Sequence, residues 1–214
     1  IELDNLKEKA ITSLKNEILV AELALEVIDN TLDDPDAESS YAYVLTEKTT
    51  ALISRNSAGS EVSAVSEAAD LLEVNSNDDD VLSGLDDGKA MLNFVKDALS
   101  DTMDVLKGAS TTYNFTESDL DTLKSNIQTQ QTTINTSSTN IVTAKTNWTG
   151  KIASYNDQIA AAEDDVSQAK SALSVAESQL ELKKSPPRTF EINAQKAEVS
   201  QAEAALSLAL ANLE

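Results

Sequence analysis

The 214-residue sequence contains no cysteine and no histidine. Thiolate and imidazole metal sites are therefore excluded, as are a nucleophilic centre that pairs serine or cysteine with histidine and a histidine general base. Most common catalytic arrangements need at least one of these residues. We therefore expect a protein that is not an enzyme and that holds no metal and no cofactor.

Basic residues are also scarce. The chain has 16 Lys and Arg against 37 Asp and Glu, which gives a formal net charge of -21. Duplex nucleic acid would be repelled, because its binding depends on Lys and Arg that neutralise phosphates. The most apolar window, residues 18–28, is interrupted by Glu22 and Glu26 and is shorter than the ~20 residues that a bilayer span needs. We expect neither a nucleic-acid partner nor a membrane span in this chain.

Residues that break helices and residues that fill a bulky core are both rare. There are five Gly and three Pro, and aromatic residues make up 4% of the chain. Apolar residues recur at seven-residue intervals in nearly every segment, which is typical of helices that pack side by side. This pattern predicts an all-α fold. Its stability must come from many thin layers of Ala, Leu and Ile, as in a helical bundle or coiled coil.

The heptad pattern is interrupted at a few places, which divide the chain into helical segments. Near the start, a regular heptad runs through residues 1–32, and Pro35 ends it because proline disfavours helical geometry in the preceding residue. The pattern is weaker between residues 38 and 75, and it becomes regular again before residue 108. Joints are therefore expected at residues 33–36, 56–60, 75–80, 108–116 and 185–188.

The longest predicted helix begins after the fourth of these joints. Thr116 with Asp119 is close to a capping box, and Phe115 with Leu120 has the spacing of a hydrophobic staple. These local signals predict a helix start at Thr116. If the helix continues to Lys184 it spans ~100 Å at 1.5 Å per residue, which implies an elongated protein.

Two apolar seams follow each other along this helix. The first seam contains Leu120, Ile127, Ile134, Ile141 and Trp148, and after a four-residue step the second contains Ile152, Ile159, Val166, Leu173 and Leu180. Such a step resembles a stutter, which locally unwinds a supercoil. Alanines accompany the second seam at positions 162, 169 and 176, and the last helix repeats the arrangement with Ile192, Val199, Leu206 and Leu213 beside Ala202 and Ala209. Alternating large and small residues let two helices approach closely.

The end of the chain resembles a known family. The residues that carry the resemblance are Leu182, Pro187-Arg188, Glu191-Ile192 and the run Val199–Glu214, with Gln201-Ala-Glu-Ala-Ala-Leu206 at its centre. They are similar to the helical arm of HlyD-type membrane-fusion proteins, also called periplasmic adaptors, just before that arm re-enters the biotinyl-lipoyl-like β domain. The resemblance is limited to this helical hairpin region.

The resemblance implies a mechanical function in a bacterial export or efflux system. Such arms act as spacers and assemble side by side, so the implied partners are sister adaptor subunits and inner-membrane pump or exit-duct components, with a homo-oligomer in the full-length protein. The implied location is extracytoplasmic, in the periplasm or cell envelope, with membrane anchoring through parts that are not in this chain. The start at Ile1 and the end within a helix also led us to expect a fragment of a larger protein.

Two architectures fit the pattern. In the first, residues 1–32 and 189–214 are the stem helices of an elongated antiparallel hairpin, and residues 37–184 form its upper part with a tip at 108–116. In the second, residues 1–148 fold back as a four-helix bundle with helices near 1–32, 38–75, 80–108 and 116–148, and the long helix protrudes and pairs with 190–214. We favour an extended hairpin that is locally thickened to a three- or four-helix bundle.

The predicted tip supplies the candidate partner-docking residues, which are Thr112, Tyr113, Asn114 and Phe115, since loops at element ends often carry function. A staple and an ordinary loop explain the same residues. Adaptor tips that meet an exit duct often carry an Arg, and here Arg occurs only at 55 and 188, which argues against docking of that type. The acidic clusters at 33–36 and 78–80 lack the Gly and distal Glu of a Ca²⁺ loop, so we interpret them as solvated helix-end charge.

Three functions from different classes were compared. The leading one is the helical spacer of an adaptor. The alternative is an extracytoplasmic four-helix sensor or ligand-binding bundle, which predicts a pocket between helices and flanking transmembrane helices. A carboxylate-based metal enzyme is disfavoured, because such bundle sites use Glu-x-x-His pairs that project into the core, and this chain has no His.

Overall fold

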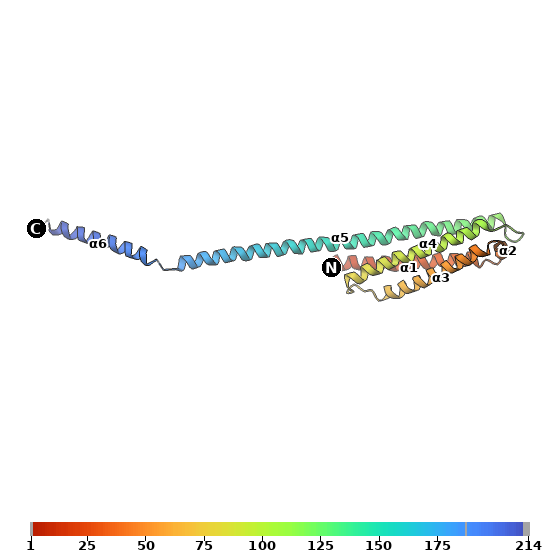
Figure 1. Cartoon of the computed structure of the whole chain (residues 1–214), viewed down its shortest axis with the longest axis horizontal. Coiled ribbons are helices and arrows are strands. Elements are labelled where there is room, and N and C mark those ends of the chain that lie inside the picture. Colours follow the sequence, from red (N-terminus) through yellow and green to blue (C-terminus); the bar gives the residue numbers. More distant parts are fainter. Residues whose placement is uncertain (1, 187, 212–214) are drawn as a thin grey trace. The chain divides into compact units, whose positions relative to one another are not determined.

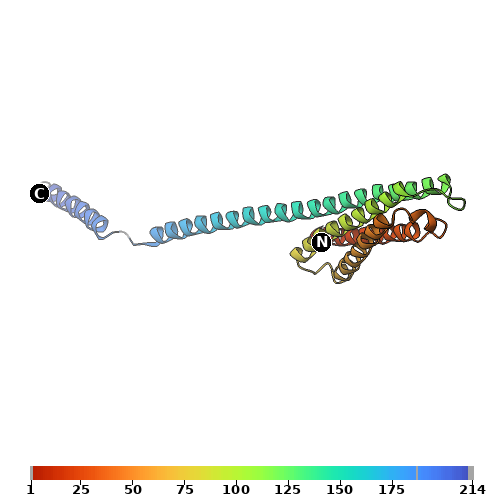
Figure 2. The same cartoon turned by 45° about the vertical axis from the view of Figure 1, so that its right-hand side comes forward.

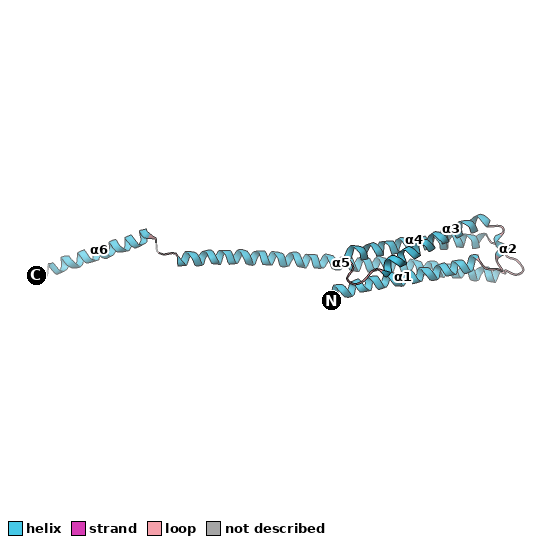
Figure 3. Cartoon of the chain, turned by 90° about the horizontal axis from the view of Figure 1, so that it is seen from below, coloured by secondary structure: helices cyan, strands magenta, loops and turns pink. Residues whose placement is uncertain are grey.

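A computed structural model describes residues 2–186 and 188–211, and all the regular structure in these residues is helical (Figure 3). The prediction of an all-α fold is therefore confirmed. The helices are α1 (Glu2–Leu32), α2 (Glu38–Tyr41), α3 (Leu45–Asp70), α4 (Asp78–Gly108), α5 (Glu117–Lys184) and α6 (Thr189–Ala211). The chain divides into two compact units, Ile1–Tyr155 and Asn156–Glu214, and the boundary lies within α5.

The first unit is a four-helix bundle built from α1, α3, α4 and the part of α5 that ends at Tyr155. Figures 1 and 2 show these segments side by side, each running in the opposite direction to the one before it. α3 packs against α4, and α1 packs against both. The first architecture would need residues 38–108 to form one ascending arm below the tip, but the chain reverses at residues 71–77 between α3 and α4. Residues 2–155 have the folded-back arrangement, which was the second of the two architectures.

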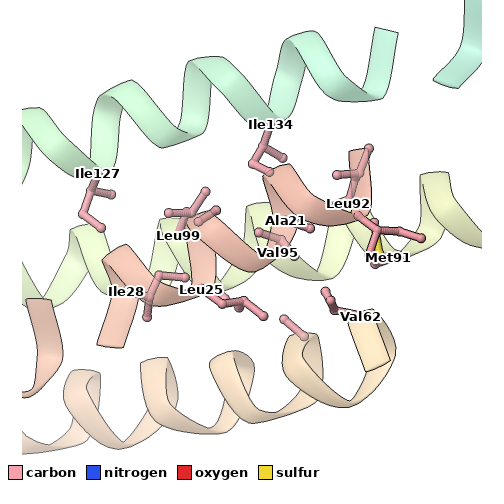
Figure 4. Packing of buried hydrophobic residues seen from close by; sticks show 14 of the residues in the cluster. Ala21, Leu25, Ile28, Val62, Met91, Leu92, Val95, Leu99, Ile127 and Ile134 are labelled. Atoms are coloured by element: carbon pink, nitrogen blue, oxygen red, sulfur yellow. The ribbon is translucent and has the colours of Figure 1, made fainter. Parts of the chain in front are cut away.

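The bundle core is made of the apolar residues that recur in the heptad pattern. Figure 4 shows Ala21, Leu25 and Ile28 of α1 facing Met91, Leu92, Val95 and Leu99 of α4, with Val62 of α3 and Ile127 and Ile134 of α5. The regular heptad predicted within residues 1–32 corresponds to a buried seam of α1, made of Ile11, Leu14, Ile18, Ala21, Leu25, Ile28 and Leu32. Burial of such side chains contributes about 1.5–3 kcal/mol each, which outweighs the small differences in helix propensity.

Two of the predicted joints differ from the structure. The joint at 56–60 is wrong, because these residues lie inside α3, where Ala58 and Val62 are buried against the bundle. The joint at 75–80 lies a few residues earlier, at 71–77, and Asp78 begins α4. Carboxylates are favourable in the first turn of a helix, where the backbone N–H groups are unpaired. The acidic run at 78–80 therefore starts a helix.

The start of α5 agrees with the local signals. The helix begins at Glu117, and its first seam is buried in the bundle through Leu120, Ile127, Ile134, Ile141 and Trp148. Pairing of residues 1–32 with 189–214 as stem helices stays a prediction. The apolar seam of α1 that would carry this pairing is already covered inside the bundle.

Candidate functional site

The predicted tip lies at the end of the bundle where α1, α2 and α4 terminate, and its loop is tied to itself by two hydrogen bonds. The Thr112 backbone N–H donates to the Phe115 carbonyl at 2.8 Å, and the Phe115 N–H donates to the Thr112 hydroxyl at 3.2 Å. The Phe115 ring is fully buried and lies edge-on to Tyr41, with ring centroids 6.4 Å apart. Of the four docking candidates, Phe115 is therefore a core residue that packs against Tyr41, and the predicted staple with Leu120 stays a prediction.

The other side chains of this loop are available to a partner. Tyr113 is 97% exposed, Asn114 is exposed and Thr112 is partly buried. Sequence reasoning missed Tyr43, which is 82% exposed, and Leu45, which is also exposed. Their neighbour Val44 belongs to the same end of the bundle, because a Cβ built on Gly108 would lie 2.6 Å from Val44 Cγ1. Nothing in the linear sequence indicates that these two segments meet.

Tyr41 fixes α2 to the end of α1. Its hydroxyl donates a hydrogen bond to the Thr31 carbonyl at 2.8 Å, and its ring is buried. Burial, with a smaller contribution from the Asp34 carboxylate, raises the pKa of the Tyr41 phenol above its ordinary value, because both oppose formation of the phenolate. The phenol therefore serves as a structural donor.

A capping box starts α5 at the other side of the loop. The Thr116 N–H donates to Asp119 Oδ2 at 2.8 Å, and the Asp119 N–H approaches the Thr116 hydroxyl at 3.4 Å. Hydrogen bonds from the Thr116 hydroxyl and from its backbone lower the pKa of Asp119, because they stabilise the carboxylate. The predicted capping box is confirmed, with Asp119 at the position that Glu or Gln usually takes.

The acidic clusters have structural partners. Asp34 accepts hydrogen bonds from the Asp36 and Ala37 backbone N–H groups, which closes the turn after α1. Asp78 lies 2.6 Å from the Lys7 ammonium, which also donates to the Ser76 carbonyl at 2.7 Å. Within residues 2–186 and 188–211 no group of three or more Asp or Glu side chains is arranged to hold a metal ion.

A polar groove of 310 Å³ lies between α1 and α5 of the bundle. Glu17 is only 6% exposed there, and Asn140 Nδ2 donates to its Oε1 at 2.9 Å. Trp148 closes the groove, with the Lys7 ammonium 5.5 Å from the centroid of its ring. The indole Nε1–H is buried and has no hydrogen-bond partner among the described residues. This groove therefore combines a buried carboxylate, a buried indole N–H and an aromatic wall, which are groups that can orient a small molecule.

The second unit has a different kind of surface. The second seam of α5 is open to solvent, since Ile159, Val166, Leu173 and Leu180 are between 49% and 58% exposed. The seam of α6 is open in the same way through Ile192, Val199 and Leu206. Scattered exposed apolar residues are normal, but a continuous row at heptad spacing marks a surface that binds another helix.

Comparison with known proteins gave no match to any family model, curated protein or solved structure. No helix among the described residues has the length and apolar character of a membrane span. The function must therefore be argued from the surfaces themselves.

Proposed function

We propose that this chain is a non-enzymatic helical spacer and assembly segment of a HlyD-type adaptor protein in a bacterial export or efflux system. The observation that carries the proposal is the pair of open heptad seams on residues 156–184 and on α6. Helices that bury no apolar face are stable chiefly when they pack against other helices. The resemblance of residues 182–214 to adaptor arms supports the same conclusion.

The bundle end supplies the second surface that the proposal needs. Tyr113, Tyr43 and Leu45 expose aromatic and apolar side chains on a short, hydrogen-bonded loop and the adjoining α2–α3 connection. Tyrosine is enriched at protein interfaces, because it combines a large apolar ring with a polar hydroxyl. We propose that this end contacts a pump or exit-duct component, and that the protein acts in the periplasm or cell envelope.

The first test is the coding sequence on both sides of this chain. The proposal expects half of a lipoyl-like β domain before Ile1 and the complementary half after Glu214. Transmembrane helices on both sides would contradict it.

A second test uses the full-length protein in its native envelope. A photo-crosslinking amino acid in place of Tyr113 is expected to capture a pump or duct component, and the same group at Asp97, an exposed position midway along α4, should not. Equal capture at the two positions would count against a docking role for the bundle end.

The four-helix bundle of residues 2–155 favours a second candidate, an extracytoplasmic sensor bundle. The specific observation is the groove with the buried Glu17 carboxylate between α1 and α5. A sensor would need flanking transmembrane helices and a ligand whose binding is lost in Glu17→Ala. The coding sequence on both sides therefore distinguishes the two candidates before any ligand is known.

A further inference from the structure

We infer that the end of α5, residues 156–184, binds α6 of the same chain as an antiparallel coiled coil, with the chain reversing between Lys184 and Thr189. This inference concerns residues 156–211 and uses the same two open seams as the proposed function, with each helix as the partner of the other. It rests on four features of these two helices: their open seams, their matching layers, their flanking charges and the short connection between them.

Both seams lack a cover within the second unit. The large residues of α5 and those of α6 recur every seven positions and are exposed, as are the intervening alanines 162, 169, 176 and 202. The α1 seam, which the first predicted architecture pairs with α6, is buried in the bundle core, whereas the second architecture pairs α6 with the long helix. The apolar stripe of α6 therefore needs a different partner, and residues 156–184 carry a stripe of the same kind.

The inner layers of the two stripes complement each other when the helices run antiparallel. In that orientation, the first seam position of one helix faces the second seam position of the other. In one such register the inner facing pairs are Ala176 with Val199, Leu173 with Ala202, and Ala169 with Leu206, and nearest the connection Leu180 faces Gln195 and Lys183 faces Ile192. Three of these layers place a large residue opposite an alanine, which is how facing core positions interdigitate without voids.

Charges beside the seam select the same register. In it, Glu177 flanks Lys196 and Lys170 flanks Glu203, so both pairs have opposite sign. Moving α6 by one heptad in one direction brings Glu163 beside Glu203 and Lys170 beside Lys196.

Moving α6 by one heptad in the other direction brings Glu177 beside Glu203 and Lys184 beside Lys196. Flanking charges of this kind set partner choice and orientation in coiled coils, and like pairs are unfavourable. The proposed register is the one that avoids all of these like-charge contacts.

The connection between the helices has the length of a hairpin loop. α5 ends at Lys184 and α6 begins at Thr189, so four residues lie between them. Antiparallel helix pairs are commonly joined by two to five residues. A short connection also gives the second helix an effective concentration on the order of millimolar, which favours binding within one chain over binding to a second copy.

Disulfide trapping tests the inference directly, because the chain has no native cysteine. Ala176→Cys with Val199→Cys places two thiols in one proposed layer, and mild oxidation is expected to link them within one chain. The matched control is Ala176→Cys with Leu206→Cys, whose positions are one heptad out of register and too far apart for disulfide geometry. Mass spectrometry of the linked peptides and a non-reducing gel give the yield and show whether the link joins one chain or two.

Three results of this experiment have different meanings. A several-fold higher yield of the intrachain link in the first pair than in the control supports the inference. A predominantly interchain link would show that a second copy covers the seam, and equal yields in the two pairs would show that the helices are not paired in this register. Either of the last two results overturns the inference.

A charge exchange adds a measurement that misfolding would not imitate. In the Ala176→Cys, Val199→Cys background, Glu177→Lys should reduce the intrachain yield, and adding Lys196→Glu should restore it. The single tryptophan, Trp148, lies in the bundle core, so its fluorescence reports whether residues 2–155 remain folded in each variant. Loss of yield that the second exchange does not restore would contradict the proposed register.

Discussion

Leu14 of α1 lies directly against Gly88 of α4, so that a Cβ built on Gly88 would stand 2.4 Å from Leu14 Cδ1. The other methyl group of Leu14 has little room, since a Cβ on Gly84 would lie 3.3 Å from Leu14 Cδ2. Gly84 and Gly88, one turn apart, therefore leave a small depression on α4 that the Leu14 side chain fills. This depression allows α1 and α4 to approach closely where Leu14 packs.

Gly88→Ala is expected to lower the free energy of unfolding of the bundle by about 1 kcal/mol. Overpacking a core costs roughly 1–3 kcal/mol, and the gain in helix propensity of about 1 kcal/mol offsets part of it. The control is Gly150→Ala in α5, where nothing lies within 4 Å of the new methyl group. This control should be neutral or stabilising in thermal unfolding followed by Trp148 fluorescence. Equal effects of the two substitutions would contradict the close packing of Leu14 against Gly88.

Phe115→Ala and Tyr113→Ala should affect different properties. Removing the buried Phe115 ring costs about 3–5 kcal/mol of stability, because a cavity forms beside Tyr41. Tyr113 is exposed, so its removal should leave the melting temperature unchanged and reduce only the capture of an envelope partner. Calorimetry separates the two variants. A marked loss of stability in Tyr113→Ala would show that the loop packs differently.

Lys7→Ala should destabilise the start of the bundle. Its ammonium joins the Ser76 carbonyl and the Asp78 carboxylate at the beginning of α4, and it lies over the Trp148 ring. Leaving these buried or half-buried partners without a donor costs about 1–3 kcal/mol. Lys9→Ala is the matched control, because Lys9 is exposed on the same helix. Urea unfolding of both variants should show a lower midpoint for Lys7→Ala alone.

Acidification should release the cap of α5. The pKa of Asp119 is lowered in the folded protein below its ordinary value of 3.8. The carboxylate of Asp119 therefore contributes its full stabilisation at pH values above 3.8. This stabilisation is lost as the pH falls through the lowered pKa of the folded protein. The measurement is hydrogen exchange of the Thr116 amide between pH 2 and 5, corrected for intrinsic exchange rates. In Asp119→Asn the protection factor of this amide should no longer change with pH. Asp121→Asn, two residues further along the helix, should retain the pH dependence.

The local features of this protein followed from short stretches of sequence. The Thr116–Asp119 cap depends on residues within one turn, so its backbone geometry is the same wherever the helix packs. The joint at 56–60 was predicted wrongly because contacts with distant segments, and not the local residues, decided the structure there. A glycine inside a helix costs about 1 kcal/mol, and burial of Ala58 and Val62 in α3 outweighs that cost.

The exposed surfaces depended on contacts between distant segments. Phe115 and Tyr113 are both aromatic residues of one loop, and only the position of Tyr41 makes one of them a core residue. Tyr43 and Leu45 reach the same end of the bundle because Val44 packs beside Gly108. No local pattern contains that information.

The sequence by itself determined that the chain is helical, where the long helix starts and which residues form its apolar seams, because heptad spacing and capping are properties of a single helix. Only the tertiary structure decided which seams are covered. The seam from Leu120 to Trp148 and the seam from Ile159 to Leu180 have the same heptad spacing, yet the first is buried and the second is open. The difference arises because hydrophobic burial needs a second surface, and α1 and α4 supply that surface to the first seam.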